Sequence, residues 1–320
     1  MYDFLIIGAG PAGLSCAIHA KKAKLKYAIL EKGTVVDSIY RFPTEMVFFS
    51  TPELLEIGDM RFVTSGFRPS RVEVLNYYHR VVEHFGLVLR PYERADAVER
   101  RSGHFRVLTS KKGMYPTRNL VFATGYFDNP RRLGVKGEEL PEVFHYFHDP
   151  YPFFGSRVAV VGGKNSAVET ALALHRHGVH VTLIHRGSAL SRGVKYWILP
   201  DIENRIKEGA IETCFESTVK EIREDSIVVV NKRGHSRVIE NDFLFVQIGY
   251  NPSIDLLKSV GVKVNRKSLV PKHSPRTMET NVRGVYIAGS IAAGKANNKI
   301  FIENGRLHGG LIVKSILSKR

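Results

Sequence analysis

The sequence predicts an α/β protein made of two units of alternating strands and helices, the second inserted into the first. One observation is a glycine-rich turn at residues 8–13, which follows the apolar run 4–7 and opens a helix-like stretch. The other is a related turn at 162–167, which follows the apolar run 158–161. A strand, a glycine-rich turn and a helix in this order are typical of dinucleotide-binding folds. We therefore expect two Rossmann-like domains.

The elements of the first unit follow from apolar runs separated by turn residues. Leu14, Ala17 and Ile18 recur at helical spacing, whereas the runs on either side of them are short and β-like. The expected elements are strands at 3–7 and 26–31, helices at 11–24 and 71–85, long loops over a ligand at 32–70, and strands alternating with basic turns at 95–122.

Three similar apolar runs, each ending near a glycine, indicate how the chain returns to its first unit. They occupy residues 119–125, 243–249 and 285–289. The second fingerprint lies between the first two runs, so the first unit is expected to be discontinuous. The predicted domains are 1–126 with 245–320, which contains the first glycine-rich turn, and 127–244, which contains the second.

The first turn predicts a site for FAD or NAD rather than NADP. Gly8 and Gly10 allow a tight turn and close approach to a pyrophosphate, and Gly13 allows the helix to pack on the strand. The helix N-terminus offers free N–H groups to the phosphates. Glu31 ends the second strand, where a carboxylate accepts hydrogen bonds from ribose hydroxyls and repels a 2′-phosphate. The alternative for Glu31 is an ordinary solvated strand end.

The second turn predicts a site for NADPH, because no acid occupies the corresponding ribose position. His185 and Arg186 stand there instead, with Arg192 and Lys195 close behind. Arginine suits a 2′-phosphate because it can donate two hydrogen bonds to it. The alternative is that Arg186 simply points into water. The middle glycine of the motif is replaced by Lys164, whose ammonium could lie near the pyrophosphate.

Composition limits the remaining classes of protein. A chain of 320 residues with 43% apolar residues can form two soluble domains, and no apolar run approaches a membrane span. Two cysteines, Cys16 and Cys214, cannot form a disulfide framework, so we expect a reducing cytoplasm. The formal net charge of +16 comes without a nucleic-acid-binding signature. It suits phosphate-bearing cofactors or an acidic partner, or serves solubility alone.

These features together resemble the low-molecular-weight thioredoxin reductase-like flavoproteins over nearly the whole chain. The resemblance implies an NADPH domain inserted into an FAD domain, and a homodimer. Where that family has its redox-active Cys-x-x-Cys, this chain has residues 145–148, His-Tyr-Phe-His. The family's acidic residue after the third turn is also absent, because Ser290 follows Gly289.

Longer stretches resemble the bacillithiol-disulfide reductases, also called bacilliredoxin reductases. The matching stretches are 40–44, 48–51, 56–59, 143–147, 162–167, 197–200, 299–305 and 308–310. Within this resemblance Lys164 is a family feature. The motifs and the resemblance give these further candidate cofactor-binding residues: Pro11, Ala12, Lys32, Thr124, Gly125, Gly162, Asn165, Ser166, Ala167, Gly289, Ser290, Lys299 and Ile300. Asn298, Lys299 and Ile300 are expected at the pyrimidine edge of the flavin.

The motifs and the resemblance assign no catalytic side chain, but they leave Cys16 and His145 as candidates. The family's proposed reactive cysteine would stand at Ala12, and Cys16 lies one helical turn deeper. A thiol near a helix N-terminus can be reactive, but a buried one is usually inert. His145 is a candidate for proton delivery near the flavin, for a structural role or, with His148, for a metal. No third ligand is evident, so we expect no metal site.

The sequence therefore predicts an FAD enzyme reduced by NADPH. By family resemblance the acceptor is a low-molecular-weight disulfide or a small redox protein. The alternatives are a reductase of ferredoxin or flavodoxin, favoured by the positive charge, and a slow FAD- and NADPH-binding redox sensor. No nucleic-acid or membrane partner is expected.

Overall fold

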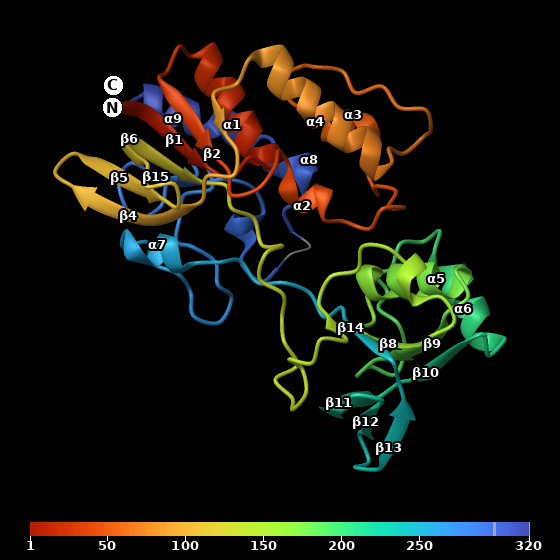
Figure 1. Cartoon of the computed structure of the whole chain (residues 1–320). Helices are drawn as coiled ribbons and strands as arrows, with labels where there is room; N and C mark the ends of the chain where they lie inside the picture. The colour runs from red at the N-terminus through yellow and green to blue at the C-terminus, as the bar shows by residue number, and fades with distance from the viewer. Residues whose placement is uncertain (297–298, 320) are drawn as a thin grey trace. The chain divides into compact units, whose positions relative to one another are not determined.

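The structure is a computed structural model that describes residues 1–296 and 299–319. It divides into two compact units (Figure 1). The discontinuous unit comprises residues 1–41, 45–129 and 250–320, and the inserted unit comprises 42–44 and 130–249. The predicted boundary at 244/245 would cut strand β14 (Phe243–Val246), which pairs with a strand of the inserted unit.

The discontinuous unit is built on a seven-stranded mixed sheet. Its strands are β1 (Tyr2–Ile7), β2 (Tyr27–Leu30), β3 (Leu89–Arg90), β4 (Ala95–Arg101), β5 (His104–Thr109), β6 (Met114–Phe122) and β15 (Val285–Ile287). The order is β3-β2-β1-β6-β5-β4, and β15 also pairs with β6. Strand β6 pairs with two strands along the same edge. Its residues 114–117 pair antiparallel with β5, and its residues 120–122 pair parallel with β15.

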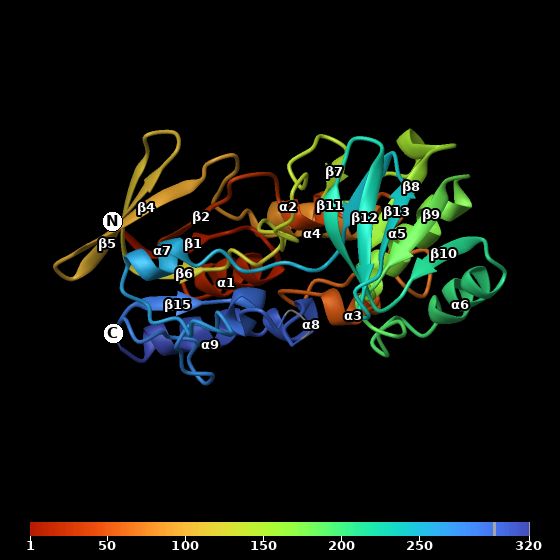
Figure 2. The same ribbon diagram turned by 90° about the horizontal axis from the view of Figure 1, so that it is seen from below.

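Two helices of this unit pack closely against each other. Helix α1 (Pro11–Lys22) follows the first glycine turn, and α9 (His308–Leu317) is the last helix of the described residues. A Cβ atom at Gly309 would lie 2.8 Å from the backbone nitrogen of Cys16, so only glycine allows this approach. The β4–β5 ribbon extends beyond both helices (Figure 2).

The remaining helices of the discontinuous unit are shorter or lie on the loops. They are α2 (Asp37–Tyr40), α3 (Pro52–Leu55), α4 (Arg71–Phe85), α7 (Asp255–Ser259), α8 (Ile302–Gly305) and the 3₁₀ turn η2 (Gly289–Ala293). The predicted helix at 71–85 is confirmed, and it begins with a complete Ser70–Glu73 capping box. The long loop predicted at 32–70 contains the single-turn helices α2 and α3.

The inserted unit has a five-stranded parallel sheet and a three-stranded antiparallel sheet. The parallel strands are β7 (Val143–Phe144), β8 (Arg157–Val161), β9 (His180–Ile184), β10 (Ile211–Cys214) and β14, in the order β10-β9-β8-β14-β7. The antiparallel strands are β11 (Ser217–Ile222), β12 (Ser226–Asn231) and β13 (Ser236–Glu240). The helices are α5 (Asn165–Arg176), α6 (Leu199–Lys207) and the 3₁₀ turn η1 (Tyr151–Phe153).

Strand alternation gives the inserted unit two apolar cores, one on each face of the parallel sheet. Val158 and Val160 of β8 pack with α5 and α6, whereas Ala159 and Val161 pack with the antiparallel sheet. Helices, parallel sheet and antiparallel sheet therefore form three layers (Figure 1). In the described ranges of both units, no helix is long and apolar enough to cross a bilayer.

Candidate nucleotide-binding sites

The first glycine turn is held by backbone contacts at two of its glycines and open at the third. Gly8 has φ +109°, and a Cβ there would lie 2.5 Å from the carbonyl oxygen of Ala123. A Cβ at Gly13 would lie 2.0 Å from the carbonyl oxygen of Gly8. A Cβ at Gly10 would meet nothing within 4 Å. Gly8 and Gly13 are thus required by the fold, and Gly10 leaves room for a ligand.

The helices that follow the two glycine turns both begin without a side-chain cap. Gly10 precedes α1 and Lys164 precedes α5, and neither first turn contains an acidic residue. Pro11 occupies the first position of α1, where its missing N–H costs nothing. The free N–H groups and the positive end of each helix dipole are therefore available to an anion such as a phosphate.

Glu31 is buried and fixes the first turn. One carboxylate oxygen accepts a hydrogen bond from the Ala9 N–H at 2.6 Å, and the other accepts one from the Gly33 N–H at 2.9 Å. Burial raises the pKa of the Glu31 carboxyl, and the two backbone donors act in the opposite direction. The neighbouring Lys32, predicted to bind cofactor, forms an ion pair with Asp128 at 2.7 Å.

Two predicted residues lie where the chain leaves β6. The Thr124 hydroxyl oxygen is buried and has no hydrogen-bond partner among the described residues. Buried hydroxyls are almost always paired in folded proteins, so a partner from a ligand would complete this position. Gly125 has φ +66°, and Ser290 Oγ lies 3.7 Å from where its Cβ would be.

The third turn packs directly on the first. A Cβ at Gly289 would lie 2.8 Å from the Ala12 Cβ, and the Gly289 N–H donates to His308 Nδ1 at 3.0 Å. Burial lowers the pKa of His308 to about 4, and the neighbouring His273 acts in the same direction. Of the residues predicted at the flavin edge, Lys299 is exposed and Ile300 is half-buried, whereas Asn298 lies outside the described residues.

The second glycine turn repeats the contact of the first. Gly162 has φ +153°, and a Cβ there would lie 2.6 Å from both the carbonyl oxygen of Gln247 and the Ala167 Cβ. At Gly163 a Cβ would come within 2.4 Å of the His185 ring. The His185 ring therefore packs against the turn itself, and burial together with Arg186 lowers its pKa.

Some of the predicted residues around the second turn have exposed side chains, whereas others are hydrogen-bonded or ion-paired within the protein. Lys164, Ser166 and Arg186 are exposed. Asn165 binds the 193–195 segment, because its side chain accepts from the Lys195 N–H at 2.7 Å and donates to the Gly193 carbonyl at 3.2 Å. Lys195 is buried and ion-paired with Glu169, so its ammonium is already neutralised.

Neither cysteine occupies a reactive setting. Cys16 is fully buried, and burial raises the pKa of its thiol to about 12. Cys214 is half-buried at the end of β10, and burial also raises its pKa. The placement of Cys16 within α1 follows the prediction, and its burial agrees with the inert alternative.

His145 is tied to a buried carboxylate. Its Nε2 lies 3.0 Å from Glu138 Oε1, and the Glu138 carboxylate also accepts from the N–H groups of Leu133 and Gly134 at 2.7 Å. This pair holds the 133–145 segment. Across the described parts of the chain, no group of three or more His, Cys, Asp or Glu side chains could hold a metal ion.

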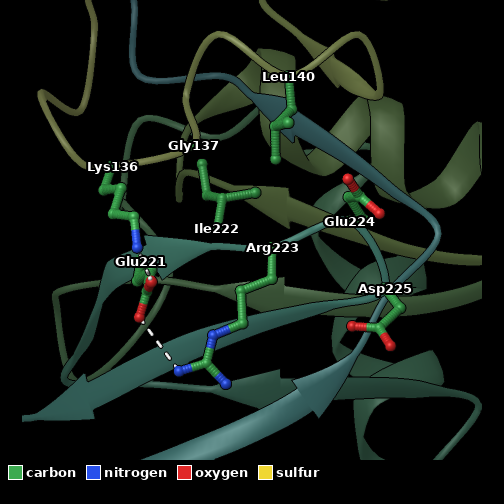
Figure 3. A pocket seen from close by; sticks show the side chains of 8 residues that line it. All are labelled: Lys136, Gly137, Leu140, Glu221, Ile222, Arg223, Glu224 and Asp225. Atoms are coloured by element: carbon green, nitrogen blue, oxygen red, sulfur yellow. Dashed lines mark hydrogen bonds and ion pairs between the residues drawn. The ribbon is translucent and has the colours of Figure 1, made fainter.

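A hollow of about 510 Å³ opens in the inserted unit, and no residue of the second glycine turn lines it (Figure 3). It lies between the 136–140 segment and the β11–β12 turn. Its charged side chains are partly paired, because Glu221 contacts both Lys136 at 2.9 Å and Arg223 at 3.1 Å. Glu224 and Asp225 add two further carboxylates, so this hollow does not suit a phosphate-bearing ligand.

One residue at the second turn was missed by sequence reasoning. Gln247 is 7% exposed, and its side-chain nitrogen has no hydrogen-bond partner among the residues that are described. A single glutamine in the apolar run 243–249 gives no signal of its own. The signal that was available is the alignment of this run with 119–125, which places Gln247 opposite Ala123.

Comparisons with known proteins agree with this geometry. The family model described as pyridine nucleotide-disulphide oxidoreductase matches residues 5–289. Bacilliredoxin reductase Bdr of Bacillus subtilis is 43% identical over 315 residues, covering 98% of this chain and 97% of that protein. The chain belongs to the bacilliredoxin reductase family.

A solved structure from this family has the same fold over the whole length of the chain. The solved structure of bacillithiol disulfide reductase Bdr from Bacillus cereus superimposes with a TM-score of 0.97 at 40% identity, covering 100% of this chain and 99% of that one. A ferredoxin–NADP reductase of Ignicoccus hospitalis is 30% identical, covering 91% and 90%. The predicted fold class of two Rossmann-like α/β domains is confirmed, and the family model identifies the chain as an oxidoreductase.

Proposed function

We propose that this protein takes hydride from NADPH through bound FAD and passes the electrons to a low-molecular-weight disulfide or a small redox protein. The observation that carries the proposal is the contrast between the two turns. Both present an uncapped helix N-terminus, but a buried carboxylate, Glu31, serves the first, whereas His185 and Arg186 serve the second. A carboxylate disfavours a 2′-phosphate and an arginine favours one.

The residues present fit both cofactors. FAD would be held by the first turn with Glu31, Thr124 and the third turn, and the open side of Gly10 provides room for its pyrophosphate. NADPH would be held by the second turn with Lys164, Ser166, His185 and Arg186. When bound, the flavin supplies the hydride and electron chemistry. The protein would bind the two cofactors and orient them toward each other. Residues 299–300 would border the flavin.

The acceptor step is proposed to need no protein thiol. Ala12 stands where the resemblance implies a reactive cysteine, and Cys16 is too deeply buried and too weakly acidic to replace it. Residues 145–148 contain no cysteine, and His145 is engaged by Glu138. Electrons would therefore leave directly from the flavin. Bacillithiol disulfide, the substrate named for the relative of known structure, is the first acceptor to test.

A second candidate function is reduction of an acidic electron carrier. The 30% identical relative is a ferredoxin–NADP reductase, and the net charge of +16 would attract an acidic protein. The two functions predict different acceptors and different salt dependence. Reduction of ferredoxin should slow markedly between low and high ionic strength, whereas reduction of a small disulfide should not.

The decisive experiment is an acceptor screen that follows NADPH oxidation by absorbance. The purified protein should be yellow, with about one FAD per chain. A bacillithiol-type disulfide, ferredoxin, flavodoxin and a quinone would be compared at equal enzyme concentration. A colourless protein that FAD does not reconstitute would refute the proposal, and rapid turnover with any of these acceptors would exclude a slow sensor.

The choice of NADPH over NADH is tested at Arg186. Replacing Arg186 with Ala removes a charge-assisted hydrogen bond, worth about 1.5–3 kcal/mol, so the KM for NADPH should rise roughly 10- to 150-fold. The KM for NADH should hardly change, because NADH has no 2′-phosphate. Equal use of both nucleotides by the unmodified protein would contradict the assignment.

A further inference from the structure

The carboxyl end of β14 carries a buried glutamine side chain, that of Gln247. Gln247 is 7% exposed, and its Nε2 has no hydrogen-bond partner among the described residues. Its backbone continues the sheet, since its N–H donates to the Val161 carbonyl at 2.8 Å. Val246 and Ile248 pack in the core on the antiparallel-sheet side. Alternation therefore turns Gln247 to the opposite face, the one that α5 covers.

This amide lies at the point where the strand order of the inserted unit reverses. Strand β8 lies between β9 and β14, and the chain continues from β8 to β9 but reaches β14 only after the rest of the unit. In open parallel sheets such a switch point forms the crevice that binds the ligand. The contact between Gly162 and the Gln247 carbonyl places the glutamine beside the second glycine turn.

The discontinuous unit shows that the backbone does not require a glutamine here. Residues 120–126 and 244–250 align without gaps, as Leu-Val-Phe-Ala-Thr-Gly-Tyr and Leu-Phe-Val-Gln-Ile-Gly-Tyr. Ala123 makes the same contact with Gly8 that Gln247 makes with Gly162, at 2.5 and 2.6 Å from the respective Cβ positions. An alanine thus fits this position, and the amide is a feature of the inserted unit alone.

We propose that the Gln247 side chain donates a hydrogen bond to an oxygen of the nicotinamide half of the pyridine nucleotide. This inference rests on the proposed function, because it places that nucleotide on the second turn. His185 and Arg186 follow β9, on one side of β8, and would hold the adenosine half. The pyrophosphate belongs at the N-terminus of α5. The other half of the nucleotide then extends toward β14, where Gln247 is a positioning residue.

The test compares two ligands that share the adenosine half. Calorimetry on the FAD-loaded protein measures the affinity for NADP⁺ and for 2′,5′-ADP, which lacks the nicotinamide half. Replacing Gln247 with Ala should weaken NADP⁺ binding about 5-fold, the usual effect of one hydrogen bond. It should leave the affinity for 2′,5′-ADP unchanged. Gln247→Met, which keeps the side-chain length without the amide, should behave in the same way and decides the matter if the alanine variant does not fold.

Two control variants separate the possible explanations. Val246→Ala truncates the adjacent side chain on the opposite face, so it should lower the melting temperature and leave both affinities unchanged. Arg186→Ala should weaken both ligands. Unchanged NADP⁺ binding in the Gln247 variants, or equal weakening of NADP⁺ and 2′,5′-ADP, would overturn the inference. If the unmodified protein binds neither ligand, the proposed NADPH site itself is wrong.

Discussion

Cys16 shows how a residue that looks functional in the sequence can be excluded by its surroundings. Its position near the N-terminus of α1 would favour a thiolate, but the helix dipole acts weakly on a thiol that water does not reach. Burial raises its pKa to about 12, so the thiol stays protonated at neutral pH. The close approach of Gly309 further restricts access to this side of α1.

We therefore expect Cys16 to be dispensable for electron transfer. Cys16→Ala should reduce a quinone at close to the rate of the unmodified protein, at a stability cost on the order of 1 kcal/mol for the lost packing. In the native protein an alkylating reagent should label the half-buried Cys214 before Cys16, as peptide mass spectrometry would show. Rapid labelling of Cys16 with parallel loss of disulfide reduction would instead assign it thiol chemistry.

His308 predicts a pH dependence of stability. Its Nδ1 accepts the Gly289 N–H, so the folded state needs the neutral ring, and burial lowers its pKa to about 4. The unfolded chain, with an ordinary histidine pKa of about 6.5, binds a proton first as pH falls. This contribution is present above pH 6.5 and is lost between about 6.5 and 4, by at most about 3 kcal/mol.

The matched variant is His308→Asn, which keeps an acceptor near the Nδ1 position but does not titrate. Urea unfolding of the FAD-free protein at pH 7 and pH 5 gives the loss of unfolding free energy for each form. The loss of unfolding free energy between pH 7 and pH 5 should be smaller in the variant. Equal losses in both proteins would show that His308 does not cause the pH dependence.

At the scale of elements, Gly13 and Gly10, two of the three glycines of the first turn, have different tasks. Gly13 is required by the fold itself, because its Cβ would meet the carbonyl oxygen of Gly8 at 2.0 Å. Gly10 has φ −71° and an open Cβ direction, so any residue fits there in the absence of a ligand. The same motif therefore contains two structural glycines, Gly8 and Gly13, and one proposed ligand-facing glycine, Gly10.

Substitution by alanine should separate these tasks. Gly10→Ala should change the unfolding free energy of the FAD-free protein by less than about 0.5 kcal/mol, yet weaken FAD retention, since the methyl group occupies the room left for the pyrophosphate. Gly13→Ala should cost about 3 kcal/mol or more. Chemical denaturation and the ratio of flavin to protein absorbance measure the two effects. Full flavin retention by Gly10→Ala would remove Gly10 from the proposed site.

Most elements could be predicted because apolar periodicity and turn residues act locally. The strands of both fingerprints, the helix at 71–85 and the run 119–122 all follow from such patterns. The domain boundary was placed too early because 243–249 resembles 119–125, and only pairing with β8 reveals that β14 belongs to the inserted unit. Pairing between distant segments leaves no mark in a single sequence.

Side-chain partners were the least predictable part of the site. Lys195 follows Arg186 closely in the sequence, but its ammonium is neutralised by Glu169 of α5, 26 residues earlier. Lys32 likewise pairs with Asp128. Gly13, by contrast, was identified correctly as a place of close helix packing, because a backbone constraint restricts the residue type directly.

At the scale of the whole molecule, the inserted unit enters and leaves the chain at adjacent points. Arg131 donates its N–H to the Gly249 carbonyl at 2.9 Å, and Asn251 donates its N–H to the Asn129 carbonyl at 2.8 Å. The two crossing segments are thus paired by their backbones. The discontinuous unit can be closed across this point without stretching the chain.

We expect the two units to be separable. Replacing residues 130–249 with a short glycine linker should give a yellow protein that retains FAD and does not oxidise NADPH, and residues 130–249 alone should bind NADP⁺. Flavin absorbance and calorimetry measure the two results. Failure of both fragments to bind their proposed nucleotides, with native-like circular dichroism, would contradict the assignment of one cofactor to each unit.

The discontinuous unit also has a consequence for synthesis on the ribosome. Strand β15 and helix α9 reach the ribosome exit only after the inserted unit of about 120 residues, a delay on the order of 10 s at usual elongation rates. Until then the end of β6 lacks its β15 partner, and the surface of α1 that α9 later covers is open to solvent. The nascent chain therefore exposes an unpaired strand edge and an apolar helix face, both of which favour aggregation. If the inserted unit folds slowly, the nascent chain needs chaperones for a longer time.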